Sequence, residues 1–195
     1  DEYNSTPVYY IPISDNTTII SSKECTISRG KDESSNFFDD YFFIINQESA
    51  NFSLGVSDES YTTSCRIILD GGSNIKSDYF THQIISTNGT VNLYDVTIQN
   101  NYYNYPNGPG GAAVYVYSNA VLNINNECII QNNISKQNGG AIYADIAYSD
   151  NTNPGKIVMY DGIIRNNKTE GEGTCGGGIC TYGEIIIYSG KIYNN

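Results

Sequence analysis

The chain has 195 residues and a formal net charge of −11, with 21 acidic against 10 basic side chains. This balance repels a phosphate backbone, and no basic cluster offsets it, so nucleic acid is excluded as a partner. No run of about 18 apolar residues is present, which argues against a membrane span. With 19 glycines, 18 tyrosines and no sustained helical periodicity, the composition predicts an all-β fold with little or no helix.

The first 83 residues repeat only loosely. Segments starting at residues 18 and 42 resemble turns of a repeat array, but their spacing is irregular. The chain start, "DEYNSTP", has no charged and then apolar leader, so we expect any signal peptide to have been removed already.

From residue 84 onward the repeat is clear. Its copies end on an isoleucine, one further residue and two asparagines, at residues 89–101, 120–133, 155–167 and 183–195. These isoleucines are 32, 34 and 28 residues apart, at Ile98, Ile130, Ile164 and Ile192. A glycine pair precedes an apolar segment in each interval. Such spacing predicts one domain over residues 1–195, a right-handed parallel β-helix with three short strands per coil. We expect it to be part of a longer solenoid.

Alternation along each strand predicts which side chains face the core. The four isoleucines point inward, as do the pairs Val91/Leu93, Leu122/Ile124, Ile157/Met159 and Ile185/Ile187. Lys191 sets the outward direction, because an unpaired lysine is almost never fully buried. Continued through the turn, the same alternation points one asparagine of each pair inward: Asn100, Asn132, Asn166 and Asn194. We expect their amides to form a ladder with a spacing of about 4.8 Å, although plain turn chemistry is the alternative.

The glycine pairs and the Ile-x-Asn-Asn endings resemble the repeats of polymorphic outer membrane proteins and of adhesin-like surface proteins. The resemblance covers about residues 84–195, with Ile where the family often has Phe. It implies an extracellular, surface-displayed domain for attachment, whose partner is a glycan or a cell-surface protein. Because a fold does not determine a function, these are expectations.

The main alternative is an enzyme acting on polysaccharides, or a non-catalytic carbohydrate-binding module, since pectate lyases share the β-helix. Those enzymes cluster aspartates on one face. Here the only pair of adjacent aspartates is Asp39-Asp40, and the single His82 is expected to be an ordinary strand residue. We therefore expect no catalytic residues and no cofactor. Acidic loops at 56–60 and 149–155 lack the spacing of a calcium loop, so solvated turns are favoured over a metal site.

Six tyrosines are candidate ligand-binding residues. Tyr94, Tyr160 and Tyr188 share one outward position, which Asn126 takes in the intervening coil. Three more lie close together in a loop: Tyr102, Tyr103 and Tyr105. Aromatic rings with a polar tip suit sugars and protein partners, although tyrosine also simply covers the surface of a β-sheet.

Among five cysteines, Cys175 and Cys180 form the only plausible local pair. An extended strand of five residues spans about 16 Å, so this disulfide requires the intervening glycines to form a turn. The others are expected to be small buried hydrophobes: Cys25 in the column of Val91, with Cys65 and Cys128 in the column of Val96.

The C-terminal coil is predicted to be an open edge. It brings Ile185, Ile187 and Ile192 to the end of the stack without a polar cap. Native solenoids cap such ends, so we expect end-to-end self-association here or a continuing chain.

Overall fold

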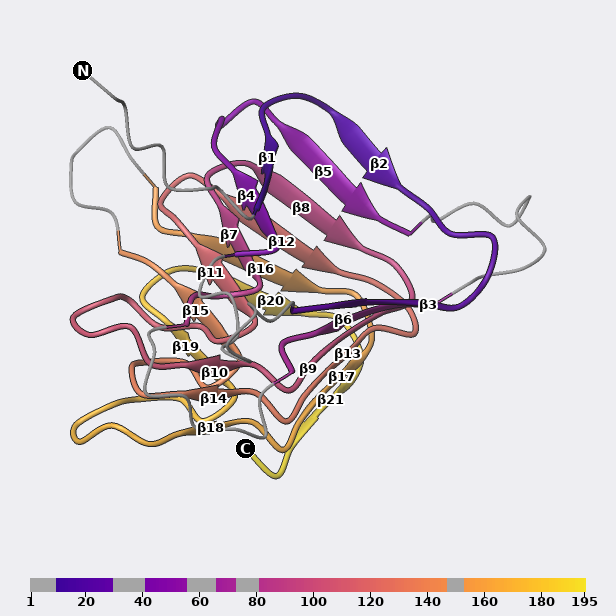
Figure 1. The fold of residues 1–195 in the computed structure, drawn as a ribbon. Helices are drawn as coiled ribbons and strands as arrows, with labels where there is room; N and C mark the ends of the chain where they lie inside the picture. The colour runs from indigo at the N-terminus through magenta and orange to yellow at the C-terminus, as the bar shows by residue number, and fades with distance from the viewer. Residues whose placement is uncertain (1–9, 30–40, 56–65, 73–80, 147–152) are drawn as a thin grey trace, which may run out of the picture.

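The protein is described by a computed structural model that covers residues 10–29, 41–55, 66–72, 81–146 and 153–195. These residues form only strands and turns, and parallel strands stack into three sheets of six strands each (Figure 1). Each pass of the chain adds one strand to each sheet, so the fold is the parallel β-helix predicted from the repeats. Among these residues, no helix is long and apolar enough to cross a membrane.

The three large sheets follow one another around each coil, and we name them sheets A, B and C. Sheet A contains β1 (Ile11–Ile13), β4 (Phe43–Ile45), β7 (Ile85–Thr87), β11 (Val114–Val116), β15 (Ile142–Ala144) and β19 (Ile179–Thr181). Sheet B contains β2 (Thr17–Ile19), β5 (Asn51–Leu54), β8 (Thr90–Leu93), β12 (Val121–Ile124), β16 (Lys156–Met159) and β20 (Ile185–Ile187). Sheet C contains β3 (Cys25–Ser28), β6 (Ile67–Asp70), β9 (Val96–Gln99), β13 (Ile129–Gln131), β17 (Ile163–Arg165) and β21 (Lys191–Tyr193).

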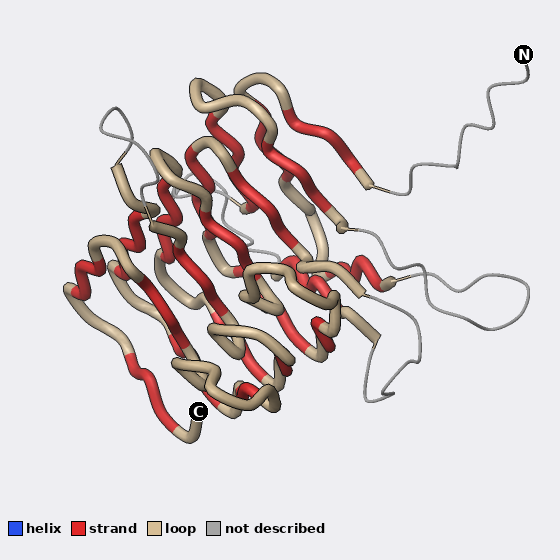
Figure 2. The backbone as a smooth tube through the Cα atoms, turned by 90° about the vertical axis from the view of Figure 1, so that its left-hand side faces the viewer, coloured by secondary structure: helices blue, strands red, loops and turns tan. Residues whose placement is uncertain are grey.

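A fourth, smaller sheet was not predicted. This sheet D contains β10 (Tyr102–Tyr103), β14 (Ile134–Ser135) and β18 (Lys168–Thr169), which directly follow the paired asparagines. Figure 2 shows the resulting stack from the side, with the strands in rows and the C-terminus at one end.

The predicted isoleucine column is confirmed. Ile130 pairs with Ile98 on one side and with Ile164 on the other, and all three are fully buried. Ile192 pairs with Ile164 in the same register but is 43 % exposed, because it lies on the last coil that the structure describes. Ile185 and Ile187 are exposed for the same reason. Self-association through this edge stays a prediction.

In each repeat a glycine pair lies just before a strand of sheet A. Gly111, Gly139 and Gly176 each lie three residues before the first residue of β11, β15 or β19, and these first residues pair with one another. The φ values of the three glycines are 70°, 66° and 69°. A Cβ on Gly139 would lie 2.1 Å from the carbonyl oxygen of Ile142. Only glycine fits this position, since L side chains rarely adopt such a φ and space is lacking.

The predicted asparagine ladder is wrong by one residue. Asn100, Asn132, Asn166 and Asn194 have φ between 55° and 56°, in the left-handed region. This conformation interrupts strand alternation, so the inward position passes to the following asparagine. Asn101, Asn133 and Asn167 are accordingly buried.

The observed ladder runs through Asn101, Asn133, Asn167 and Asn195. Asn133 Oδ1 accepts a hydrogen bond from the backbone N–H of Asn101 (3.1 Å), and its Nδ2 donates to Ile98 O (3.2 Å) and to Asn167 Oδ1 (3.0 Å). Asn167 repeats the pattern with Asn195. Each asparagine therefore satisfies backbone groups that the turn leaves without strand partners.

A buried arginine ends this ladder toward the N-terminus. Arg29 Nη2 donates to Asn101 Oδ1 (3.1 Å) and to His82 O (3.2 Å), while its guanidinium lies over the Phe42 ring. Gly71, in the intervening coil, has no side chain to extend the ladder, and a Cβ there would collide with Asn101. The guanidinium thus takes the place of one more amide donor.

The cysteine columns are partly corrected. Cys25 pairs with Ile67, which pairs with Val96, so it belongs to the Val96 column and not to the Val91 column. Cys128 lies in that column too and is buried, and burial raises the pKa of its thiol to about 11. Cys65 lies outside the described residues.

Candidate ligand-binding surface

Two of the six candidate tyrosines are buried. Tyr102 and Tyr103 form β10 and are only 2 % and 1 % exposed. Burial also raises the pKa of both phenols. Their prediction as surface ligand contacts is wrong, because the loop that was expected to display them is instead a strand of sheet D.

Tyr105 is exposed and contacts the only histidine. The His82 ring lies between two tyrosines, with centroids 4.5 Å from Tyr41 and 4.6 Å from Tyr105. In the sequence, Tyr41 and His82 lie shortly before β4 and β7 of sheet A. The aromatic stack gives the imidazole a packing role that the sequence did not reveal.

Tyr160 and Tyr188 lie together on the outer surface. They directly follow β16 and β20, and their rings stack with centroids 5.3 Å apart and planes 13° from parallel. Both are exposed, Tyr188 to 68 %. Tyr94 holds the corresponding place after β8 but is half-buried. In the coil between, Asn125 and not Asn126 occupies the position, because the extra residue of that repeat follows it.

A tyrosine cluster on the outer face of sheet A was missed. Tyr115 pairs with Tyr143, which pairs with Cys180, and the two tyrosine rings stack with a centroid distance of 5.8 Å. Tyr117 packs on Tyr115 at 4.2 Å, and Tyr182 meets Tyr143 edge-on at 6.2 Å. We call these four residues the sheet A cluster. Its inner two rings are buried, whereas Tyr117 and Tyr182 are exposed.

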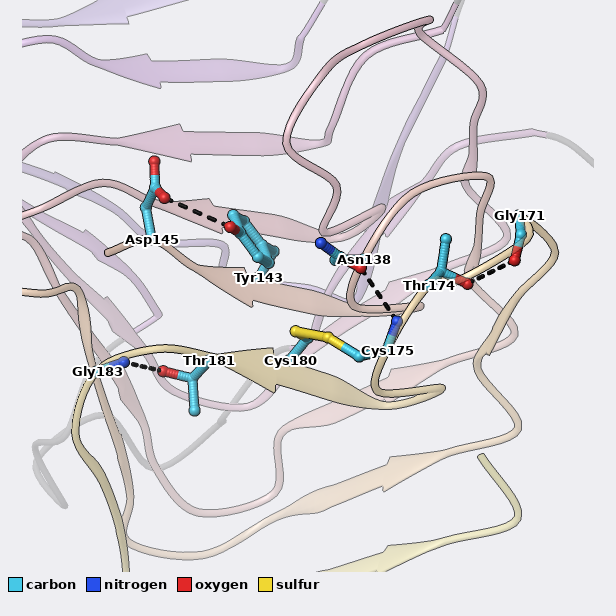
Figure 3. The surroundings of a disulfide bond; sticks show 9 residues. All are labelled: Asn138, Tyr143, Asp145, Gly171, Thr174, Cys175, Cys180, Thr181 and Gly183. Carbon is cyan, nitrogen blue, oxygen red and sulfur yellow. Dashed lines mark hydrogen bonds between the residues drawn. A yellow bond between two sulfur atoms is a disulfide. The ribbon is translucent and has the colours of Figure 1, made fainter. Parts of the chain in front are cut away.

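Asp145 fixes the phenols of the inner pair. Tyr115 Oη donates to Asp145 Oδ2. Tyr143 Oη donates to Asp145 Oδ1 at 3.4 Å, as Figure 3 shows. Burial, and next the hydrogen bond to Asp145, raise the pKa of Tyr115. The carboxylate also accepts the backbone N–H of Ile146 (2.8 Å). The inner rings are thereby held as a rigid base for Tyr117 and Tyr182.

A disulfide joins Cys175 to Cys180 beside this cluster (Figure 3). Gly176–Gly178 form the turn between the two cysteines, and β19 starts only at Ile179. The loop is also tied to the preceding coil, because Cys175 N donates to Asn138 Oδ1 (3.0 Å) and Gly139 N donates to Cys175 O (2.9 Å).

Removing this disulfide should lower stability moderately. For a loop this short, the cross-link restricts the unfolded chain enough to contribute roughly 2 kcal/mol. We expect Cys175→Ser/Cys180→Ser to lower the urea midpoint correspondingly, and reductant to have no further effect on that variant. Cys25→Ser is the control, since Cys25 forms no disulfide. An unchanged midpoint for the double variant would contradict the prediction.

No group of three or more His, Cys, Asp or Glu side chains that could hold a metal occurs in the part of the chain that the structure describes. Asp39, Asp40 and the acidic loop at 56–60 lie outside that part, as do residues 149–152 of the other acidic loop.

No family model matches the chain, and comparisons with curated proteins and with solved structures also return no match.

Proposed function

We propose that this chain is an attachment domain of a surface-displayed protein, and that it binds a glycan on a partner surface through exposed tyrosines. The observation that carries the proposal is the placement of four exposed rings on rigid strand ends. They are Tyr117 and Tyr182 of the sheet A cluster, with the stacked pair Tyr160 and Tyr188.

Rigid tyrosines suit this role for energetic reasons. A tyrosine offers a flat apolar face and a polar hydroxyl while losing only two side-chain torsions on binding. Here much of that loss has already occurred, because Tyr117 packs on Tyr115 and Tyr160 stacks on Tyr188. Preorganised contacts lower the cost of binding.

Two further features support an extracellular attachment role. The glycine-pair and Ile-x-Asn-Asn repeats resemble those of polymorphic outer membrane proteins and adhesin-like proteins. The Cys175–Cys180 disulfide fits an oxidising compartment outside the cytosol.

An array that displays both glycans and cell-surface proteins tests the proposal. We expect the purified chain to bind at least one glycan, and replacement of all four exposed tyrosines by alanine to weaken binding at least tenfold. The matched control is Ile11→Ala/Ile20→Ala, which removes exposed apolar side chains from the first coil. Binding to proteins alone, or to nothing, would overturn the proposal, as would undiminished glycan binding by the quadruple variant.

A further inference from the structure

A groove of ≈ 320 Å³ lies at the corner between sheets B and C. Its lining includes Asp161 and Ser189, which directly follow Tyr160 and Tyr188 in the sequence. Glu127 and Lys191 also contribute polar groups. The groove therefore adjoins the most exposed pair of stacked tyrosines in the described chain.

The lining of the groove also includes three consecutive members of one inward-facing column, which are Cys128, Gly162 and Gly190. Val96, Cys128, Gly162 and Gly190 occupy equivalent positions, each directly before paired residues of sheet C. The last two have no side chain, and their φ values of 114° and 107° favour glycine. Interior packing also requires glycine at both positions, because a Cβ on Gly190 would lie 2.4 Å from Met159 Cε and one on Gly162 would lie 2.8 Å from Cys128 O.

The polar lining suits hydroxyl groups better than a charged ligand. Asp161 and Glu127 offer carboxylate oxygens as acceptors, and Lys191 and Ser189 offer donors. Glu127 stays largely exposed, with its carboxylate 3.8 Å from Arg66 Nη2. A sugar hydroxyl both donates and accepts, so this mixture can satisfy several hydroxyls at once.

We propose that the groove binds a neutral pyranose of a glycan, with the sugar ring on Tyr188 and its hydroxyls toward Asp161 and Glu127. This inference rests on the proposed function, since it locates the sugar site of the attachment domain. Uronic acids are disfavoured, because the two carboxylates and the net charge of −11 repel a third carboxylate.

Calorimetric titration of the full chain with oligosaccharides tests the site. The neutral probes are hexamers of β-1,4-glucose, β-1,4-N-acetylglucosamine and β-1,4-mannose, and the acidic probe is a hexamer of α-1,4-galacturonate. We expect one or more neutral hexamers to bind more tightly than the galacturonate. Tyr188→Ala should weaken that binding tenfold or more, as truncating a central tyrosine contact typically does.

Matched variants separate this site from the sheet A cluster. Tyr182→Ala removes a comparably exposed tyrosine (57 %) from the same coil, and we expect it to weaken binding by a smaller factor than Tyr188→Ala does. Asp161→Asn retains the size of the side chain but removes its charge, so it should narrow the preference for neutral over acidic hexamers. Unchanged urea midpoints for all three variants would show that they fold.

The outcomes distinguish the two proposals. If Tyr182→Ala rather than Tyr188→Ala abolishes neutral-sugar binding, the groove is not the site, yet glycan attachment stands. If galacturonate binds more tightly than every neutral hexamer, the inferred ligand class is wrong. If neither the hexamers nor any arrayed glycan binds, both proposals fail.

Discussion

Asn133→Ala should lower the free energy of unfolding by about 3 kcal/mol. The Asn133 side chain is fully buried and accepts the backbone N–H of Asn101 while donating to the carbonyl of Ile98. Alanine leaves both backbone groups buried without these partners, and each orphaned group costs about 1–3 kcal/mol. Urea unfolding followed by circular dichroism measures the loss.

The neighbouring asparagine provides the control. Asn132 is exposed and has φ of 56°, a conformation that glycine adopts freely. Asn132→Gly should therefore change stability by no more than about 0.5 kcal/mol. If Asn132→Gly proved more damaging than Asn133→Ala, the ladder would instead run through the first asparagine of each pair.

Ile130→Ala should cost about 3 kcal/mol, within the usual range of 2–5 kcal/mol for such buried truncations. Ile130 is fully buried between Ile98 and Ile164, so alanine leaves a cavity with packed walls on two sides. The same unfolding measurement reports the change.

Ile192→Ala is the matched control, because this residue belongs to the same column but is partly exposed on the last coil. Its truncation should cost less than about 1 kcal/mol, since little apolar area returns to water. Equal losses at the two positions would mean that the last coil is covered in solution, as the expected self-association requires.

Much of the fold could be predicted from the repeats. The isoleucine endings align without gaps in three copies, and strand alternation then gives the inward residues correctly for Leu122 and Ile157. Both inferences rest on the alternation of inward and outward side chains along a strand. They also rest on the near-constant length of the repeated segments that form the strands of sheets B and C. Stacked coils require both features, so the sequence shows them directly.

The ladder was misplaced because alternation does not continue through a turn. Asn100 adopts a left-handed conformation, and this single residue reverses the direction of every side chain that follows. The sequence did contain a signal, since asparagine is the non-glycine residue most often found in that region. Two adjacent asparagines are best read as one that turns the chain and one that points inward.

The tyrosines were harder to predict because exposure depends on what packs over a strand. Tyr102 and Tyr115 are both buried, yet one belongs to a sheet that was not expected and the other to the outer face of sheet A. A usable signal was the tyrosine at the second residue of both β11 and β15, directly after the glycine turns. That position places the rings one above the other on sheet A.

The connections from sheet D to sheet A are longer, and vary more in length, than the turns between sheets B and C in the same coils. They comprise residues 104–113, 136–141 and 170–178, whereas from β8 onward the turns between sheets B and C have only two or three residues before the column of Val96. Gly173 lies in the last connection, and a Cβ there would meet nothing within 4 Å. This corner can thus accept added sequence without disturbing the stack. A peptide epitope inserted at Gly173 would be displayed on a rigid carrier, beside the disulfide.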